Sequence, residues 1–463
     1  MNTDSVVFLS CFLPLTVLLH RIIPGKKMRN FLLLGASLLF YSFGGFSGLA
    51  IVLVSAGVNF LLAGLIEKGR LGKLLPAVAV AANLALLIAY KYLNFLLQDV
   101  LGLSQAGFSW AAPLGISFFT FKSISYLVDV YRKKTTSGTF LQFLLYVSFF
   151  PQVMAGPITR FGEFCHTLEQ PDTGFDTFVR GLRRFVIGLS KKLLLATALG
   201  AVADRVFPLG AGELSAALAW VGAVSYLLQI YFDFSGYSDM AIGLGMAFGL
   251  ATPENFCYPY IAPTVGDFWR RWHISLSGWF RDYLYIPLGG NRKGVVRTAL
   301  NKVIVFTLCG IWHGADWTFL VWGLWHGLFT ALESLLPVKK WVGRISGRVV
   351  GHIYTLLVVM LGFVMFRAET VEQGLRIITA MFVGTPATAS ATVLFYGIVT
   401  GEWLFALFAG GVLCLPVAPW CKANAKLSRL AESVSWIACA VLFALCLMKL
   451  ASGGFAPFIY AQF

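Results

Sequence analysis

The fold is decided by residues 303–336, which read VIVFTLCGIWHGADWTFLVWGLWHGLFTALESLL. Two glycines, Gly310 and Gly314, lie on either side of His313, and Asp316 is a residue type that caps helix amino termini. The pattern predicts a helix that breaks at His313 and a second helix that begins after Asp316. A broken helix at membrane depth is tolerated only where it is buried in protein or lines a cavity.

The break is expected near the middle of a bilayer. About ten residues separate His313 from the basic segment 291–302, and at about 1.5 Å per residue they cross roughly half of a bilayer. An ionisable side chain at that depth is costly and marks a functional site by default. His313 is therefore the first candidate catalytic residue, and a hydrogen-bonded core histidine is the alternative.

The composition of the whole chain is typical of a membrane protein. Hydrophobic residues make up 58% of the 463 residues and charged residues 12%, whereas a soluble domain carries about 25% charge. Long apolar runs recur, and each crossing needs roughly 20 residues, so we expect an all-α polytopic protein with about 11 transmembrane helices plus re-entrant or interfacial helices. Residues 1–463 are expected to form one membrane-embedded domain. The clearest runs are 31–43, 49–65, 75–97, 394–415 and 433–450.

The net charge of +15 is explained by membrane topology, and no nucleic-acid partner is expected. Basic residues concentrate in short segments between apolar runs, whereas other connections contain no Lys or Arg. By the positive-inside rule the basic segments are cytoplasmic and the others face outward. Both termini, including the tail 451–463, are then expected outside the cytoplasm. The basic segments are 21–29, 67–73, 131–134, 180–192, 291–293, 339–348 and 422–429.

A second candidate site lies in residues 265–294, VGDFWRRWHISLSGWFRDYLYIPLGGNRKG. The segment is too charged for an ordinary span, and its interleaved aromatics and arginines are typical of an interfacial or re-entrant helix. At helical spacing His273 shares a face with Trp269 and Phe280, which directs the imidazole toward protein. The arginines are expected to contact lipid phosphates, with substrate binding as the alternative.

The remaining motifs carry weaker signals. His326 suits either a packed helix–helix contact, in which its imidazole bonds a carbonyl, or a functional role. Other histidines lie near basic residues, where interfacial side chains are expected; they are His20, His166 and His352. The eight cysteines form no Cys-x-x-Cys pair, so neither disulfides nor a metal site is expected. The sequence contains no P-loop, Rossmann fingerprint or Gly-x-Ser-x-Gly elbow.

Four stretches of the chain resemble sequences of the membrane-bound O-acyltransferase (MBOAT) family. Within it they most resemble bacterial membrane subunits that O-acetylate alginate or peptidoglycan. The similarity runs from about residue 114 to residue 336 and is looser elsewhere. The stretches are FFPQVMAGPITRFGEF (149–164), YFDFSGYSDMAIGLGMAFG (231–249), RRWHISLSGWFRDYLYIPLGGNR (270–292) and GIWHGADWTFLVWGLWHG (310–327).

The resemblance implies an enzyme of a bacterial cytoplasmic (inner) membrane. Its helices would form a shell around a funnel or tunnel, where cytoplasmic acetyl-CoA, the acyl donor, meets an acceptor from the other side. The resemblance places the family's essential histidine at His313. This residue is our candidate general base, because histidine titrates near neutrality. The family's second polar partner falls on His273, which would orient or polarise the acyl carbonyl or the other imidazole.

The chain ends FAPFIYAQF, and this tail resembles a FIYxQF motif of related proteins or of their small companion peptides. The resemblance implies that Tyr460 accepts the acyl group on its phenol. Tyr460 would pass the group to an extracytoplasmic SGNH-type partner, which selects and modifies a polysaccharide. A phenol with a pKa of about 10 loses its proton more easily than an alkyl alcohol, and its ester is a more reactive donor. An aromatic anchor at the outer membrane interface is the alternative.

Three other functions stay open. D-alanyl transfer in teichoic acid synthesis shares the two histidine motifs. A secondary transporter would also have broken helices and buried histidines, but it should show two related halves, and the sequence shows none. A scaffold without activity would leave two costly intramembrane histidines without a role.

Overall fold

The computed structural model describes residues 3–103, 112–336, 338, 345–384, 388–453 and 458–459. Every regular element in these residues is a helix, which confirms the expected all-α class. The chain divides into two compact units, which are Met1–Phe185 with Tyr237–Glu254 and Val186–Gly236 with Asn255–Phe463. The division does not test the expected single membrane-embedded domain, which stays a prediction.

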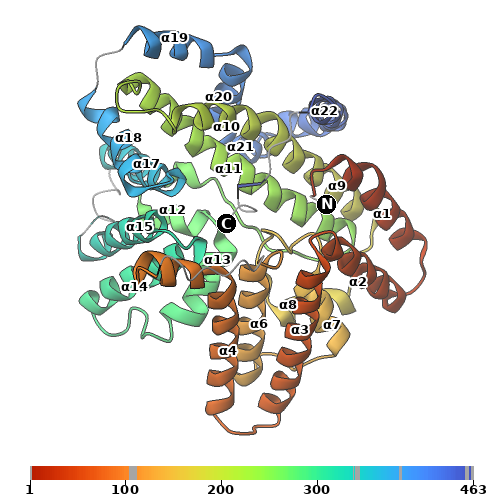
Figure 1. The fold of residues 1–463 in the computed structure, drawn as a ribbon. Coiled ribbons are helices and arrows are strands. Elements are labelled where there is room, and N and C mark those ends of the chain that lie inside the picture. The colour runs from red at the N-terminus through yellow and green to blue at the C-terminus, as the bar shows by residue number, and fades with distance from the viewer. Residues whose placement is uncertain are drawn as a thin grey trace. The chain divides into compact units, whose positions relative to one another are not determined.

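The first unit contains three neighbouring helices, in which α6 (Ile116–Tyr131) lies against both α3 (Phe46–Glu67) and α4 (Leu74–Lys91) (Figure 1). Asn59 on α3 and Asn83 on α4 bond to each other through both amides, at 2.7 and 3.2 Å. Amide pairs of this kind hold apolar helices together where water is absent. The other elements are η1 (Phe8–Phe12), α1 (Leu13–Ile22), α2 (Lys26–Ser42), α5 (Leu93–Phe95), η2 (Leu96–Val100), α7 (Phe140–Ser148) and α8 (Phe161–Glu169).

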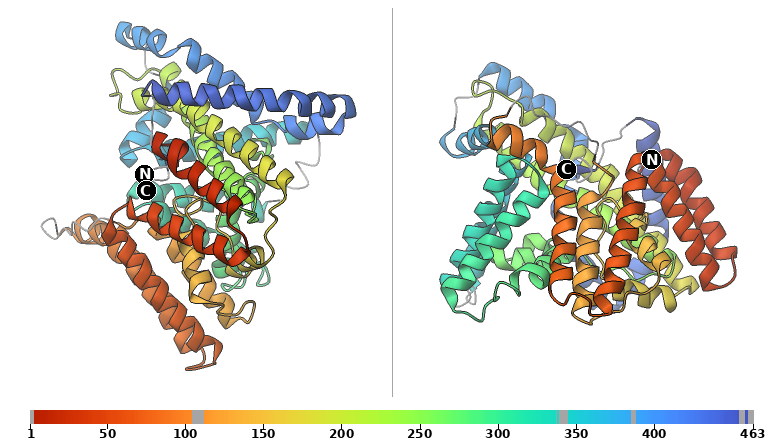
Figure 2. Two further views of the ribbon diagram at one scale, coloured as in Figure 1. Left: turned by 90° about the vertical axis from the view of Figure 1, so that its right-hand side faces the viewer. Right: turned by 60° about the horizontal axis from the view of Figure 1, so that its bottom comes forward.

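The second unit is built around α14 (Val295–His313) and α15 (Trp317–Leu335), which pack side by side (Figure 1). α17 (Ile345–Arg367) lies against α15, and the long helix α22 (Ala425–Ala451) precedes the carboxy-terminal residues (Figure 2). α9 (Phe175–Ser190) and α11 (Ala216–Ala247) contribute residues to both units. The remaining elements are η3 (Lys191–Ala196), α10 (Thr197–Val206), η4 (Pro259–Ile261), α12 (Val265–Arg271), α13 (Ile274–Phe280), η5 (Arg281–Tyr285), α18 (Val371–Val383), α19 (Ala389–Ile398), α20 (Gly401–Leu413) and α21 (Val417–Ala423).

Glycine allows α14 and α15 to approach closely. A Cβ added to Gly323 on α15 would lie 2.5 Å from the backbone oxygen of Phe306 on α14. A Cβ added to Gly310 on α14 would collide with the backbone oxygen of Phe319 on α15. Small residues are typical of such crossings in membranes, because close backbone approach increases the van der Waals contact between the helices.

Seven helices in the described residues are long and apolar enough to cross a membrane, or eight if the bent pair α19–α20 is one span. The protein is a multi-pass membrane protein. The expected count of 11 is not confirmed. The expected apolar run 31–43 falls on α2, which has 17 residues, and the run 394–415 falls on the bent pair α19–α20. The seven candidate spans are Phe46–Glu67, Leu74–Lys91, Phe175–Val206, Ala216–Ala247, Val295–His313, Gly347–Arg367 and Val434–Ala451.

The expectation that residues 180–192 form a loop between helices is wrong. The chain is helical from Phe175 to Val206, through α9, η3 and α10. The basic residues recur at helical spacing between apolar residues, so a count of charge in a short window cannot distinguish this amphipathic helix from a loop. One of them, Arg184, bonds to Asp239 at 2.8 Å within the first unit.

We expect Gly323→Ala to lower the free energy of unfolding by about 1–3 kcal/mol, because the new methyl group must push α14 and α15 apart. The thermal unfolding midpoint in detergent, followed by tryptophan fluorescence, measures the effect. Gly411→Ala is the matched control, since Gly411 also lies in a helix, α20, but has open space at its Cβ position. Equal midpoints for the two variants would contradict the close helix contact.

Candidate functional site

The predicted helix break at His313 is confirmed. α14 ends at His313, and Gly314 follows with extended backbone at φ −164° and ψ 156°. A Cβ on Gly314 would collide with the ring of Phe319, so no other residue fits without a shift. The Asp316 side chain accepts a hydrogen bond from the backbone N–H of Thr318 at 2.9 Å and caps α15, as expected.

The depth of His313 in the membrane stays a prediction. α14 begins at Val295, so it includes most of the basic segment 291–302 that was expected to be a loop. Its 19 residues are about 28 Å long at 1.5 Å per residue, which is enough to cross a bilayer. The helix length therefore does not by itself place His313 at mid-depth.

His313 lies among aromatic rings from two other helices. His313 is 3% exposed. The centre of its ring lies 5.1 Å from that of Trp322 on α15 and 5.2 Å from that of Phe366 on α17. The interplanar angles of 85° and 80° are those of T-shaped contacts, which aromatic rings prefer. The surrounding rings exclude water from the imidazole on these sides and hold it in one orientation.

His273 lies at a second break, between α12 and α13. Its backbone is left-handed, with φ 45° and ψ 54°, which costs a non-glycine residue about 1–3 kcal/mol and persists only where the surroundings fix it. The expectation of a continuous helix through this residue is therefore wrong. The expected burial is confirmed, because His273 is 1% exposed and its ring lies edge-on to Phe234 on α11 at 4.6 Å.

The buried amide of Asn255 sets the tautomer of His273. The Asn255 Oδ1 atom accepts the backbone N–H of Ser275 at 3.1 Å, so this atom is an oxygen and an acceptor. The same oxygen lies 3.2 Å from His273 Nδ1, which must then donate its hydrogen. A neutral imidazole with a hydrogen on Nδ1 carries its lone pair on Nε2.

Burial favours this neutral form of His273. The residue lies outside the candidate spans, and burial lowers the pKa of its imidazole from 6.5 to about 3. The cause is desolvation, which penalises the charged imidazolium. At neutral pH the Nε2 atom of His273 is consequently a hydrogen-bond acceptor.

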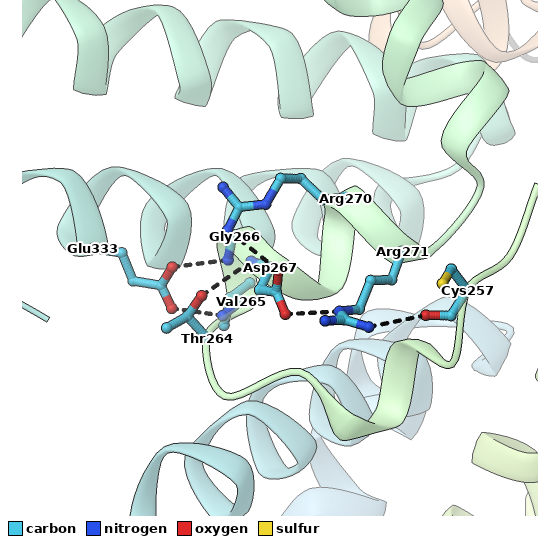
Figure 3. A network of polar contacts seen from close by, with 8 residues as sticks. All are labelled: Cys257, Thr264, Val265, Gly266, Asp267, Arg270, Arg271 and Glu333. Carbon is cyan, nitrogen blue, oxygen red and sulfur yellow. Dashed lines mark hydrogen bonds and ion pairs between the residues drawn. The ribbon is translucent and has the colours of Figure 1, made fainter. Parts of the chain in front are cut away.

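A network of polar contacts fixes α12, the helix that leads to His273 (Figure 3). The carboxylate of Glu333, near the end of α15, accepts the backbone N–H groups of Val265 at 2.6 Å and Gly266 at 2.8 Å. A negative group at a helix amino terminus satisfies free donors and interacts well with the helix dipole. Because α15 also carries Trp322, one helix supports the surroundings of both histidines.

The other end of α12 is tied to the segment that carries Asn255. Asp267 accepts a hydrogen bond from Arg271 at 2.8 Å, and Arg271 donates to the carbonyl oxygen of Cys257 at 3.3 Å (Figure 3). The backbone N–H of Ile274 bonds in turn to the carbonyl oxygen of Asn255 at 3.0 Å. These bonds hold the His273 break and Asn255 in register.

His326 occupies a packed contact, but with a different partner from the expected carbonyl. Its Nδ1 accepts a hydrogen bond from the Trp269 indole N–H at 3.4 Å. Its Nε2 and the indole nitrogen of Trp322 are buried without a hydrogen-bond partner among the described residues. The centre of the Trp322 ring lies 5.1 Å from the centre of the His326 ring and 5.1 Å from that of His313, so Trp322 contacts both imidazoles.

Among the other histidines, His20 departs from the expectation of an interfacial side chain. It is buried, and its ring lies 5.1 Å from Phe248 within the first unit. His352 bonds through Nε2 to the backbone oxygen of Ile261 at 2.7 Å. Neither contact involves the residues around His313.

The structure places His313 and His273 in one unit and connects them through aromatic contacts. Phe366 touches the His313 ring, Phe363 lies 6.4 Å from Phe366, and Trp272, the neighbour of His273, lies 5.1 Å from Phe363. The third candidate, Tyr460, lies outside the described residues.

Asn255 was not predicted as a site residue from the sequence. Its signal was a single amide in ATPENFCYPY (251–260), a connection without Lys or Arg that leads into the His273 segment. An asparagine in such a loop is also a common turn former, so the sequence pattern does not distinguish the two roles.

Comparisons with known proteins show the family of the chain. Residues 73–370 match the membrane-bound O-acyltransferase family. The chain is 37% identical to a probable alginate O-acetylase of Azotobacter vinelandii over 99% of both chains, and 34% identical to a peptidoglycan O-acetyltransferase of Helicobacter pylori over 82% of this chain and 79% of the relative. It is 30% identical to a teichoic acid D-alanyltransferase of Bacillus subtilis over 49% of this chain and 60% of the relative. The protein therefore belongs to the membrane-bound O-acyltransferase family and is an O-acyltransferase.

Proposed function

We propose that the protein moves an acetyl group from cytoplasmic acetyl-CoA across a bacterial cytoplasmic (inner) membrane, for O-acetylation of an envelope polysaccharide or exopolysaccharide. The observation that carries the proposal is the buried His313 at the α14–α15 break, with His273 in the same unit. Relatives named as polymer O-acetylases match 99% and 82% of the chain, whereas the D-alanyltransferase of Bacillus subtilis matches 49%. This difference favours acetyl transfer over D-alanyl transfer.

His313 acts as the general base in this proposal. The phenol oxygen of Tyr460 attacks the thioester carbon of acetyl-CoA, the C–S bond breaks, and an ester bond to the phenol forms. The phenol proton moves to the imidazole of His313 and from there to the departing sulfur, so CoA leaves as the thiol. Proton transfer of this kind typically contributes about 10²–10⁴-fold to the rate.

His273 orients a reacting group. Polarisation of the acyl carbonyl would need a hydrogen-bond donor at Nε2, and the neutral tautomer that Asn255 selects has an acceptor there. We therefore assign His273 an orienting role, in which its Nε2 accepts a hydrogen bond from the other imidazole or from the phenol of Tyr460. Asn255 is a positioning residue, because it acts through His273.

Tyr460 relays the acetyl group outward. Its neighbours Phe458 and Ile459 belong to the unit that contains both histidines, which supports this assignment. The resulting phenyl ester is a more reactive donor than an alkyl ester. An extracytoplasmic SGNH-type partner would take the group onto a serine and transfer it to a sugar hydroxyl of the polymer. Both termini of the chain are then outside the cytoplasm.

We expect labelled acetyl-CoA to acetylate Tyr460 in the purified full-length protein. Mass spectrometry of the carboxy-terminal peptide measures the label. His313→Ala should lower the rate of labelling and of CoA release by about 10²-fold or more, because the phenol keeps its proton. Tyr460→Phe should abolish the label at this position.

The control for the histidine change is His166→Gln, since His166 lies in α8 of the first unit and should leave the rate unchanged. Absence of acetyl on wild-type Tyr460 would remove the relay. A normal rate of CoA release in His313→Ala would remove His313 as the base. Faster labelling from a D-alanyl carrier than from acetyl-CoA would reverse the choice of donor.

We expect Asn255→Asp to move the acid limb of the pH–rate profile to higher pH. A carboxylate beside Nδ1 stabilises the imidazolium and raises the His273 pKa by about one to three units. Less of the required neutral imidazole is then present at any pH near that value, so activity is lost earlier as the pH falls. CoA release across about pH 3–8 measures the shift, because this range includes the wild-type pKa of about 3 and the raised values of about 4–6.

The neutral control is Ser275→Ala, which removes a 2.9 Å hydrogen bond to the same Asn255 oxygen without adding charge. It can change the rate but should not move the acid limb. An unchanged profile in a folded Asn255→Asp variant would exclude the proposed role of Asn255.

A further inference from the structure

Two opposite charges are buried together in apolar helices of the second unit. Lys192 is the second residue of the π-helix η3, Asp233 lies in α11, and each side chain is no more than 3% exposed. The Lys192 ammonium and an Asp233 carboxylate oxygen form an ion pair. Both helices are candidate membrane spans, and charged residues in such helices mark functional sites by default.

The carboxy-terminal residues complete this pair. The second carboxylate oxygen of Asp233 accepts the backbone N–H of Ile459 at 2.8 Å. The Lys192 ammonium lies 4.4 Å from the centre of the Phe458 ring, and Phe458 is 2% exposed. The carboxylate thus bonds a peptide N–H while the ammonium faces an aromatic ring, and both contacts are strong where water is excluded.

We propose that Lys192 and Asp233 form a docking site for the chain's own carboxy-terminal segment, which binds through Phe458 and Ile459. The ligand chemistry is an aromatic side chain followed by a free backbone N–H. The docking contact is inferred from the hydrogen bond of Ile459 and the ring contact of Phe458. Its purpose, which is to position Tyr460 for acylation, rests on the proposed function.

The position of the docking site on α11 suits that purpose. Asp233 holds Ile459, and the next residue of the helix, Phe234, contacts the His273 ring at 4.6 Å. Ile459 is therefore bound at an α11 position next to the one that contacts the His273 ring. Lys192 and Asp233 are therefore positioning residues for the tyrosine.

Hydrogen exchange of the full-length protein in lipid nanodiscs tests the docking. The double variant Lys192→Met/Asp233→Leu removes both charges, and a buried ion pair is often replaced by apolar residues of similar size without loss of stability. We expect amide exchange in the peptide containing residue 459 to become about tenfold faster or more, with α11 still protected. Phe458→Ala should have the same effect from the side of the tail.

Asp204→Asn is the matched control. It breaks an ion pair with Arg367 at 2.6 Å in the same unit and should leave the tail protected. Unchanged tail exchange in a double variant whose α11 stays protected would overturn the docking site. If α11 of the double variant loses protection, the Phe458→Ala variant provides the test of docking. Normal tail exchange in Phe458→Ala then overturns the proposal.

The same samples separate docking from the relay. Tyr460→Phe should keep the tail protected and lose the acetyl label. A wild-type protein with a protected tail and no label would remove the relay and leave the docking site. In the double variant we expect slower acetylation of Tyr460 with an unchanged KM for acetyl-CoA, and a normal acetylation rate would remove the positioning role of the pair.

Discussion

The close contact between α14 and α15 is the constraint on which the site depends. Gly310 and Gly323 allow the two backbones to touch, and the break at Gly314 turns the chain from one helix into the other. The pair carries His313 at the break and Glu333 at the far end of α15, where its carboxylate holds α12. Without this contact the side chains packed around the two histidines would not be held in place.

Asn255 holds the buried polar groups of His273 and Ser275 in a defined arrangement. The Asn255 amide receives three hydrogen bonds on one oxygen and thereby chooses which nitrogen of His273 is basic. The left-handed backbone at His273 persists because bonds on both sides of the break hold it. In an apolar protein interior such bonds are costly to lose, so they specify one geometry.

Local signals predicted some of these features well and others badly. The break at His313 and the cap at Asp316 followed from glycine and aspartate in an apolar run, because short-range backbone preferences decide both. The segment around His273 was expected to be one helix, since its residues have helical periodicity. Its break depends on Asn255 and Phe234, which lie 18 and 39 residues earlier in the sequence.

The sequence alone determined that the chain is an all-α membrane protein, because apolar composition needs no tertiary information, and its two histidine motifs sufficed for the resemblance to the acyltransferase family. Tertiary structure alone decided which nitrogen of His273 accepts a hydrogen bond and that Lys192 belongs to a buried pair and not to a loop between helices. The physical reason is the same in both cases. The state of an ionisable group depends on the atoms that replace water around it, and the fold brings those atoms from distant parts of the chain.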